Sequence, residues 1–350
     1  MSESWKQLCA VAATALAVIV GADIALARLA PPRQLREVQD GVADLRSKNP
    51  DTLVLGSSHA RTLHVLGGEL ERRTGGAQTL VAVPLENGKL VAYDWLLKNK
   101  LEPLEDATDG DGHPAKSRLR RLVLITEWWD SCPRDHDSPY WNLPARAWTF
   151  DDFLADVARD GINGFNRNYL QNRLRRIFSG SSLVYDRTQQ VLVKYLVQAA
   201  RHQPLGPTPE EVALTTTQWQ AMVEHGANCI GDAKQMQALA DISEFAAARH
   251  LEMTILLFPR KPATLNERSR QTTLPQFAAL VRGFAAPRGI RVVDLTTTAP
   301  VGDDDFMEDF DHINAVGNKK FASWALEHDL GFLLQPAPPP VSSMAQGNGP

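Results

Sequence analysis

Cysteine is scarce in this chain: three occur among its 350 residues, and no two of them are spaced as CxxC. Three thiols cannot build the disulfide framework of a small secreted protein or a four-thiolate zinc site. Cys9 lies in an apolar N-terminal segment, which leaves Cys132 and Cys229 as one possible bridge if the chain is exported. The sequence predicts no metal site and no cofactor.

An excess of positive charge is also lacking. The chain has 37 Lys and Arg against 41 Asp and Glu, a net charge of −4, so no basic field attracts a polyanion and nucleic acid is not an expected partner. A glycine-rich phosphate-binding fingerprint is absent too, which argues against a cytosolic nucleotide-binding domain. Apolar residues make up 43% of the chain, a globular composition that excludes bulk disorder.

One long apolar run is present, from Leu8 to Ala27, with Asp23 as its only charge. At 1.5 Å per residue it is long enough to cross a hydrocarbon core of about 30 Å. Residues 1–30 are therefore predicted to be a membrane anchor or, alternatively, a signal peptide with an A-x-A-like cleavage site at Ala25–Ala27. Either interpretation predicts an extracytoplasmic domain, periplasmic or on the outer face of the cytoplasmic membrane. The distribution of basic residues argues against this orientation. Lys6 precedes the apolar run, whereas Arg28, Arg33 and Arg36 follow it, and an excess of basic residues favours the cytoplasmic side.

Five short β-type runs alternate with helix-compatible sequence. They cover residues 52–55, 79–83, 122–126, 254–258 and 291–295. This alternation predicts an α/β fold, a three-layer α/β/α sandwich with a five-stranded parallel sheet. We expect one α/β domain over residues 31–334, with a large helical insertion from 131 to about 249, where β-type runs are few. Residues 335–350 are rich in proline, serine and glycine and are predicted to be a disordered tail.

Two motifs at opposite ends of this alternation carry chemistry. The first strand ends in Gly56-Ser57-Ser58, and groups at the carboxyl ends of parallel strands gather in one crevice. Such a turn is also a common helix N-cap. Near the other end of the chain, Asp309 to Gly317 follow the pattern D-x-x-H-x-N-x-x-G, in which an aspartate can orient His312 so that its other ring nitrogen meets a serine. A histidine so placed can act as a general base near neutral pH.

These segments, LVLGSSHAR and DFDHINAVG, resemble the first and last motifs of the SGNH (GDSL-like) hydrolase superfamily. The resemblance covers roughly residues 50–130 and 250–330 and implies a flavodoxin-like sheet. It implies that Ser58 is the nucleophile, His312 the base and Asp309 its orienting carboxylate, with Asp311 as a competing carboxylate. The Gly-Ser-Ser variant is similar to the D-alanyl transfer proteins of lipoteichoic acid synthesis and to membrane-anchored polysaccharide O-acetylation factors.

The resemblance also implies an oxyanion hole. The amide of Ser58 and Gly88, with Asn87 beside it in VPLENGK, are the candidate donors. The family's third motif supplies an asparagine after the third strand, but here that strand leads into TEWWD. Loss of one oxyanion donor costs about 10²–10³ in rate. Glu127, Trp128 and Trp129 of this segment are candidate substrate-binding residues, and the alternative for the aromatic side chains is packing against the sheet.

The sequence therefore leads to the hypothesis of a serine esterase or acyl (acetyl) transferase that uses a Ser-His-Asp triad on a cell-envelope glycan or acylated polymer. The chain would be anchored to the membrane through its N-terminal segment. The alternative is a non-catalytic accessory protein, or a glycan-binding partner of a membrane O-acyltransferase.

Overall fold

The computed structural model describes residues 33–86, 88–101, 118–133, 148–162, 209–307 and 312–336, together with single residues 14, 18, 21, 167, 169 and 170. The predicted anchor or signal segment at 1–30 lies almost wholly outside these residues, as does the predicted tail from residue 337 onward. Within the part of the chain that is described, no helix combines the length and apolar character needed to span a bilayer.

The chain divides into two compact units. One comprises residues 1–36 and 136–206, and in it α7 (Phe150–Asp160) is described, with Thr149 as its N-cap. The other comprises residues 37–135 and 207–350 and contains the sheet. All the site residues discussed below belong to this second unit.

Five parallel strands form the sheet, in the order β2-β1-β3-β4-β5. Their bounds are β1 Thr52–Gly56, β2 Leu80–Pro84, β3 Arg121–Thr126, β4 Glu252–Leu257 and β5 Arg291–Asp294. The first three strands are buried throughout, which explains why they read as continuous apolar runs rather than as alternating patterns. The predicted fold class is confirmed.

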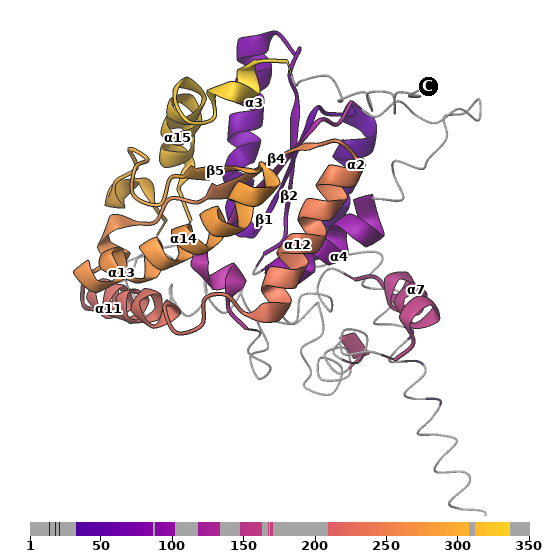
Figure 1. Ribbon diagram of the computed structural model, residues 1–350, viewed down its shortest axis with the longest axis horizontal. Helices are drawn as coiled ribbons and strands as arrows, with labels where there is room; N and C mark the ends of the chain where they lie inside the picture. The colour runs from indigo at the N-terminus through magenta and orange to yellow at the C-terminus, as the bar shows by residue number, and fades with distance from the viewer. Residues whose placement is uncertain are drawn as a thin grey trace, which may run out of the picture. The chain divides into compact units, whose positions relative to one another are not determined.

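Helices flank the sheet in layers (Figure 1). On one face α3 (Thr62–Thr74) and α15 (Ala315–Glu327) pack together over a hydrophobic cluster that includes Val54, Val123 and Leu256 of the central strands. On the other face α4 (Leu90–Leu96) packs against α12 (Ala233–Ala248), and Gly41 of α2 (Arg33–Lys48) approaches Val83 of β2. The remaining helices are α11 Pro209–Gly226, α13 Glu267–Gln271 and α14 Thr273–Ala285, with short 3-10 or π turns at 58–61, 97–101, 128–131, 262–264, 286–288, 303–305 and 331–334.

The predicted helical insertion has two different parts where it is described. No strand lies between residues 131 and 249 in its described stretches. However, α12 is the crossover helix that leads from β3 into β4, and it packs against α4 and β4 as part of the sandwich. Helix α11 packs instead against α13 and α14.

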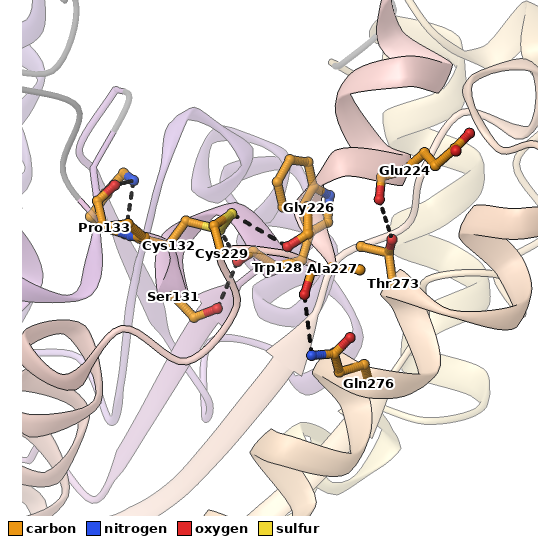
Figure 2. The surroundings of a disulfide bond; sticks show 11 residues. Trp128, Ser131, Cys132, Pro133, Glu224, Gly226, Ala227, Cys229, Thr273 and Gln276 are labelled. Carbon is orange, nitrogen blue, oxygen red and sulfur yellow. Dashed lines mark hydrogen bonds between the residues drawn. A yellow bond between two sulfur atoms is a disulfide. The ribbon is translucent and has the colours of Figure 1, made fainter. Parts of the chain in front are cut away.

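A disulfide joins Cys132 to Cys229, with their Cα atoms 4.8 Å apart (Figure 2). Cys132 directly follows the short helix η3 (Trp128–Ser131), and Cys229 lies in the turn after α11. The carbonyl of Ser131 accepts hydrogen bonds from the amides of Gly231 and Asp232, at 3.1 and 2.8 Å. The bridge considered from the sequence is therefore present, and it ties the end of α11 to the segment that follows β3.

We expect replacement of both bridged cysteines by serine to lower the free energy of unfolding by about 2–5 kcal/mol. The bridge closes a long loop and so reduces the conformational entropy of the unfolded chain. The two cysteines are 97 residues apart. The measurement is urea-induced unfolding of the full chain, with Cys9→Ser as the matched control that removes a thiol and leaves the bridge intact. Equal unfolding midpoints for the double variant and the control would contradict the expectation.

Candidate functional site

The turn after β1 places two adjacent serines in different roles. Gly56 allows the close approach of β1 and β3 there, because a Cβ at this residue would lie 2.7 Å from Cβ of Ile125. Ser57 is the N-cap of the short helix η1 (Ser58–Arg61), and its Oγ accepts a hydrogen bond from the His59 amide. The N-cap interpretation of this motif therefore applies to Ser57 and not to Ser58.

Ser58 contacts a histidine that lies 254 residues away in the sequence. Its Oγ is 2.6 Å from Nε2 of His312, which is a hydrogen-bonding distance. Ser58 is buried, with 5% of its surface exposed, yet it lines a pocket. The structure thus brings together the two residues predicted from the opposite ends of the fold.

The loop before α15 holds His312 in place through its main chain. The carbonyl of His312 accepts a hydrogen bond from the amide of Met307 at 2.7 Å. Asn314 is the N-cap of α15, and its side-chain oxygen accepts from two amides of the first helical turn. Gly317 lies so close to the Asp305 carbonyl that a Cβ would be 2.4 Å from that oxygen. The asparagine and glycine of the D-x-x-H-x-N-x-x-G pattern are therefore structural.

Three residues of interest lie outside the described residues. They are Asp309, the predicted orienting carboxylate, Asp311, its competitor, and Asn87, the neighbour of the predicted oxyanion donor. For the triad, the structure therefore describes the serine and histidine.

Gly88 is described, and its main chain is engaged in a turn. Its amide donates to the Leu85 carbonyl at 2.7 Å, and its carbonyl accepts from the Tyr93 hydroxyl at 2.9 Å. A Cβ at Gly88 would lie 2.4 Å from the Tyr93 ring, so the glycine is required for packing. Gly88 is not among the residues that line the pocket. In this structure the Gly88 amide, the predicted oxyanion donor, donates to Leu85.

A buried polar network lies beside the Ser58–His312 pair. Nδ1 of His59 is 2.9 Å from Oγ of Ser57 and 3.0 Å from Oε1 of Glu127, and the other carboxylate oxygen of Glu127 accepts from Arg260. The side chains of His59 and Arg260 are only 2% and 3% exposed. The centroid of the His59 ring is 4.5 Å from that of Phe258 and 5.3 Å from that of His312. His59 therefore connects the Glu127–Arg260 ion pair to the histidine that contacts Ser58.

Asp130 is a second buried carboxyl next to this network. One of its oxygens accepts a hydrogen bond from the Glu127 amide at 3.1 Å. Burial, and then the nearby Glu127 carboxylate, raise the pKa of Asp130 well above its ordinary value. Asp130 therefore favours its protonated form more than a solvent-exposed aspartate does, and the buried Arg260 forms its ion pair with Glu127.

The pocket in front of Ser58 has a volume of about 100 Å³. It is lined by both serines of the turn, by His59, Glu127 and Arg260, and by the apolar side chains of Trp128, Trp129, Trp219 and Met222. The predicted residues Ser58, Glu127, Trp128 and Trp129 therefore line the same pocket. Trp128 is only 3% exposed, and a Cβ at Gly226 would lie 2.5 Å from its ring, so the packing alternative holds for Trp128. Trp129 is half-buried, with the Lys89 ammonium 5.3 Å from its ring centroid.

Sequence reasoning missed four residues of this site, namely His59, Trp219, Met222 and Arg260. His59 and His64 raise the question of metal binding, but no group of three or more potential metal ligands occurs within the described ranges. Arg260 had a usable signal, because it follows β4 at the same sheet edge at which Glu127 follows β3. Trp219 and Met222 had none, because α11 reaches the pocket only through its tertiary packing.

The arrangement can perform nucleophilic chemistry, since the hydroxyl of Ser58, which lines a small pocket, lies within hydrogen-bonding distance of a ring nitrogen of His312. Comparisons with known proteins do not identify a family, because no protein-family model and no curated protein sequence matches the chain.

Proposed function

We propose that this protein is a serine esterase or acyltransferase of SGNH type that acts on small acyl esters, most simply acetyl esters, of a cell-envelope glycan. The observation that carries the proposal is the 2.6 Å contact between Ser58 Oγ and His312 Nε2 at the carboxyl edge of a parallel sheet. A nucleophile and a base within hydrogen-bonding reach are what covalent acyl transfer requires.

In the proposed reaction, Ser58 Oγ attacks the ester carbonyl and its proton passes to His312 Nε2. The tetrahedral intermediate collapses, the bond to the alcohol oxygen breaks, and His312 returns the proton to the departing alcohol. An acyl-serine remains. Water or a second hydroxyl then attacks it, with His312 taking the new proton, and Ser58 regains its hydrogen. In this proposal Asp309 orients the ring of His312.

Oxyanion stabilisation is the weakest part of this machinery. The amide of Ser58 is the proposed donor, and the Gly88 amide donates to Leu85 instead. After β3, where the SGNH pattern has an asparagine, this chain has Glu127, whose carboxylate is engaged with His59 and Arg260. Loss of a single donor lowers kcat by about 10²–10³. We therefore expect slower turnover than from a complete oxyanion hole.

Two observations support an extracytoplasmic location and a glycan substrate. Disulfides persist in oxidising compartments, and Cys132 and Cys229 are bridged. Half-buried Trp129 lines the pocket and offers aromatic surface of the kind that stacks on sugar rings. The apolar segment at Leu8–Ala27 is the proposed link to the membrane.

A second candidate function is that of a non-catalytic partner of a membrane O-acyltransferase. The observation that favours it is Glu127 in place of the oxyanion asparagine. In that case, capture of the full chain from membranes recovers a polytopic membrane protein, and recovery is the same for Ser58→Ala and His312→Ala.

The proposal is tested by acetate release from an O-acetylated polysaccharide. We expect the purified full chain to release acetate and the Ser58→Ala variant to release none above the heat-unfolded control. Equal release by wild type and variant would contradict the role of Ser58. Absence of release by the folded wild type, together with capture of a membrane partner by both variants, would favour the second candidate.

A further inference from the structure

Two residues of the pocket come from α11 and not from the sheet edge. Trp219 and Met222 are three positions apart, so they lie on the same face of this helix, and both are half-buried where they line the pocket beside Ser58. The other lining residues belong to the segments that follow β1, β3 and β4. Helix α11 therefore forms a separate wall of the pocket.

This wall is fixed in place by contacts in the C-terminal half of α11. The Gln220 side chain donates to the Ala263 carbonyl at 2.8 Å, and Glu224 forms an ion pair with Arg268. At the C-terminal end of α11, Gly226 packs directly against the Trp128 ring, and the Cys132–Cys229 bridge follows (Figure 2). Side chains on α11 thus face Ser58 from a position set by several independent contacts.

Trp219 is held from inside the pocket as well. The guanidinium carbon of Arg260 lies 5.5 Å from the centroid of its ring, a cation–π distance, and Arg260 is itself paired with Glu127. The indole is therefore restrained on the pocket side by a buried cation that cannot move without breaking an ion pair.

We propose that Trp219 and Met222 set the length of the acyl chain that Ser58 accepts, limiting the enzyme to acetyl or similarly small groups. This inference rests on the proposed function. A pocket of about 100 Å³ is small beside the roughly 300–1,000 Å³ of most ligand pockets. An acetyl methyl fits against the apolar wall, whereas each further methylene must displace the indole or the thioether. The sugar alcohol, which is polar, leaves on the open side.

The test uses three esters with one leaving group: the acetate, butyrate and hexanoate of p-nitrophenol. The three esters share one leaving group. A change that affects only the contacts with the leaving group therefore alters kcat/KM by the same factor for all three esters. We expect the wild type to prefer acetate, and Trp219→Ala to raise the hexanoate-to-acetate ratio of kcat/KM by at least about tenfold, in keeping with the value of a methylene in a hydrophobic pocket.

Leu214→Ala is the matched control, because Leu214 is 61% exposed on the same helix and does not line the pocket. We expect its ratio to equal that of the wild type. Met222→Ala is the second pocket variant, with the same expected direction, and it serves as the test if Trp219→Ala fails to fold by circular dichroism. Ratios within twofold of the wild type in both pocket variants would overturn the inference and leave the proposed function intact. Absence of Ser58-dependent hydrolysis of all three esters by the wild type would overturn the proposed function and, with it, this inference.

Discussion

Replacing Ser58 by alanine is expected to lower kcat on a small acetyl ester by about 10³–10⁶-fold, while the free energy of unfolding changes by less than about 1 kcal/mol. The variant removes the oxygen that lies 2.6 Å from His312 Nε2, so no acyl-enzyme can form. The Ser58 side chain contributes little to the fold, because the neighbouring Ser57 provides the N-cap of η1. Initial rates and urea unfolding of the same samples measure the two effects separately.

Ser58 and His312 should act as one catalytic unit. We expect His312→Ala to reduce kcat by a similar factor, and the double variant Ser58→Ala/His312→Ala to be no slower than either single variant, because a nucleophile without its base is already inactive. Ser57→Ala is the matched control at the adjacent position, with a loss of at most about tenfold. Multiplicative losses in the double variant, or equal losses for Ser57→Ala and Ser58→Ala, would contradict a catalytic pair.

The second large effect is expected on stability. Glu127→Gln should lower the free energy of unfolding by about 3–5 kcal/mol, because it removes the charged partner of a buried cation. The side chain of Arg260 is 3% exposed, and the same carboxylate lies 3.0 Å from Nδ1 of His59. The measurement is urea unfolding at pH 7, and a loss under 1 kcal/mol would contradict this assignment of the network.

Asp130→Asn is the matched control for that experiment. For this variant we expect the free energy of unfolding, relative to the wild type, to rise with pH. Asp130 is a buried carboxyl whose pKa is raised well above 3.8 in the folded protein, chiefly by burial. The folded state therefore holds this proton more tightly than the unfolded state does. The wild type loses this stabilisation as the pH rises from about 4 through the folded pKa. Asparagine keeps a neutral acceptor and does not titrate, so the stability of Asp130→Asn relative to the wild type should increase with pH. A difference that is constant from pH 5 to pH 9 would contradict the raised pKa.

The fold was predictable because its strands are buried on both faces. Residues 53–55, 80–83 and 122–125 are apolar without interruption, which distinguishes central parallel strands from surface elements. The meeting of Ser58 with His312 was predictable for a related reason. Segments that follow the strands of a parallel sheet converge at one edge, so motifs far apart in sequence become neighbours there.

The pairing of residues within the polar network and the second wall of the pocket could not be predicted in the same way. Glu127 and Arg260 become partners because β3 and β4 are adjacent in the sheet, and strand order is not written in any local pattern. Trp219 reaches the pocket through α11, whose position depends on a disulfide and on contacts with Ala263 and Arg268. Gly88 was predicted to be an oxyanion donor by its place in the sequence, whereas its turn with Leu85 and its packing on Tyr93 are tertiary features.

The central claim is that His312 activates Ser58 as a nucleophile. Its most direct test is to treat the folded full chain with a fluorophosphonate and to locate the modified residue by peptide mass spectrometry, with His312→Ala treated in parallel. We predict one modified peptide in the wild type, with the adduct on Ser58, and none in the variant. An unlabelled wild type, or labelling of Ser58 at the same rate without His312, would contradict the claim.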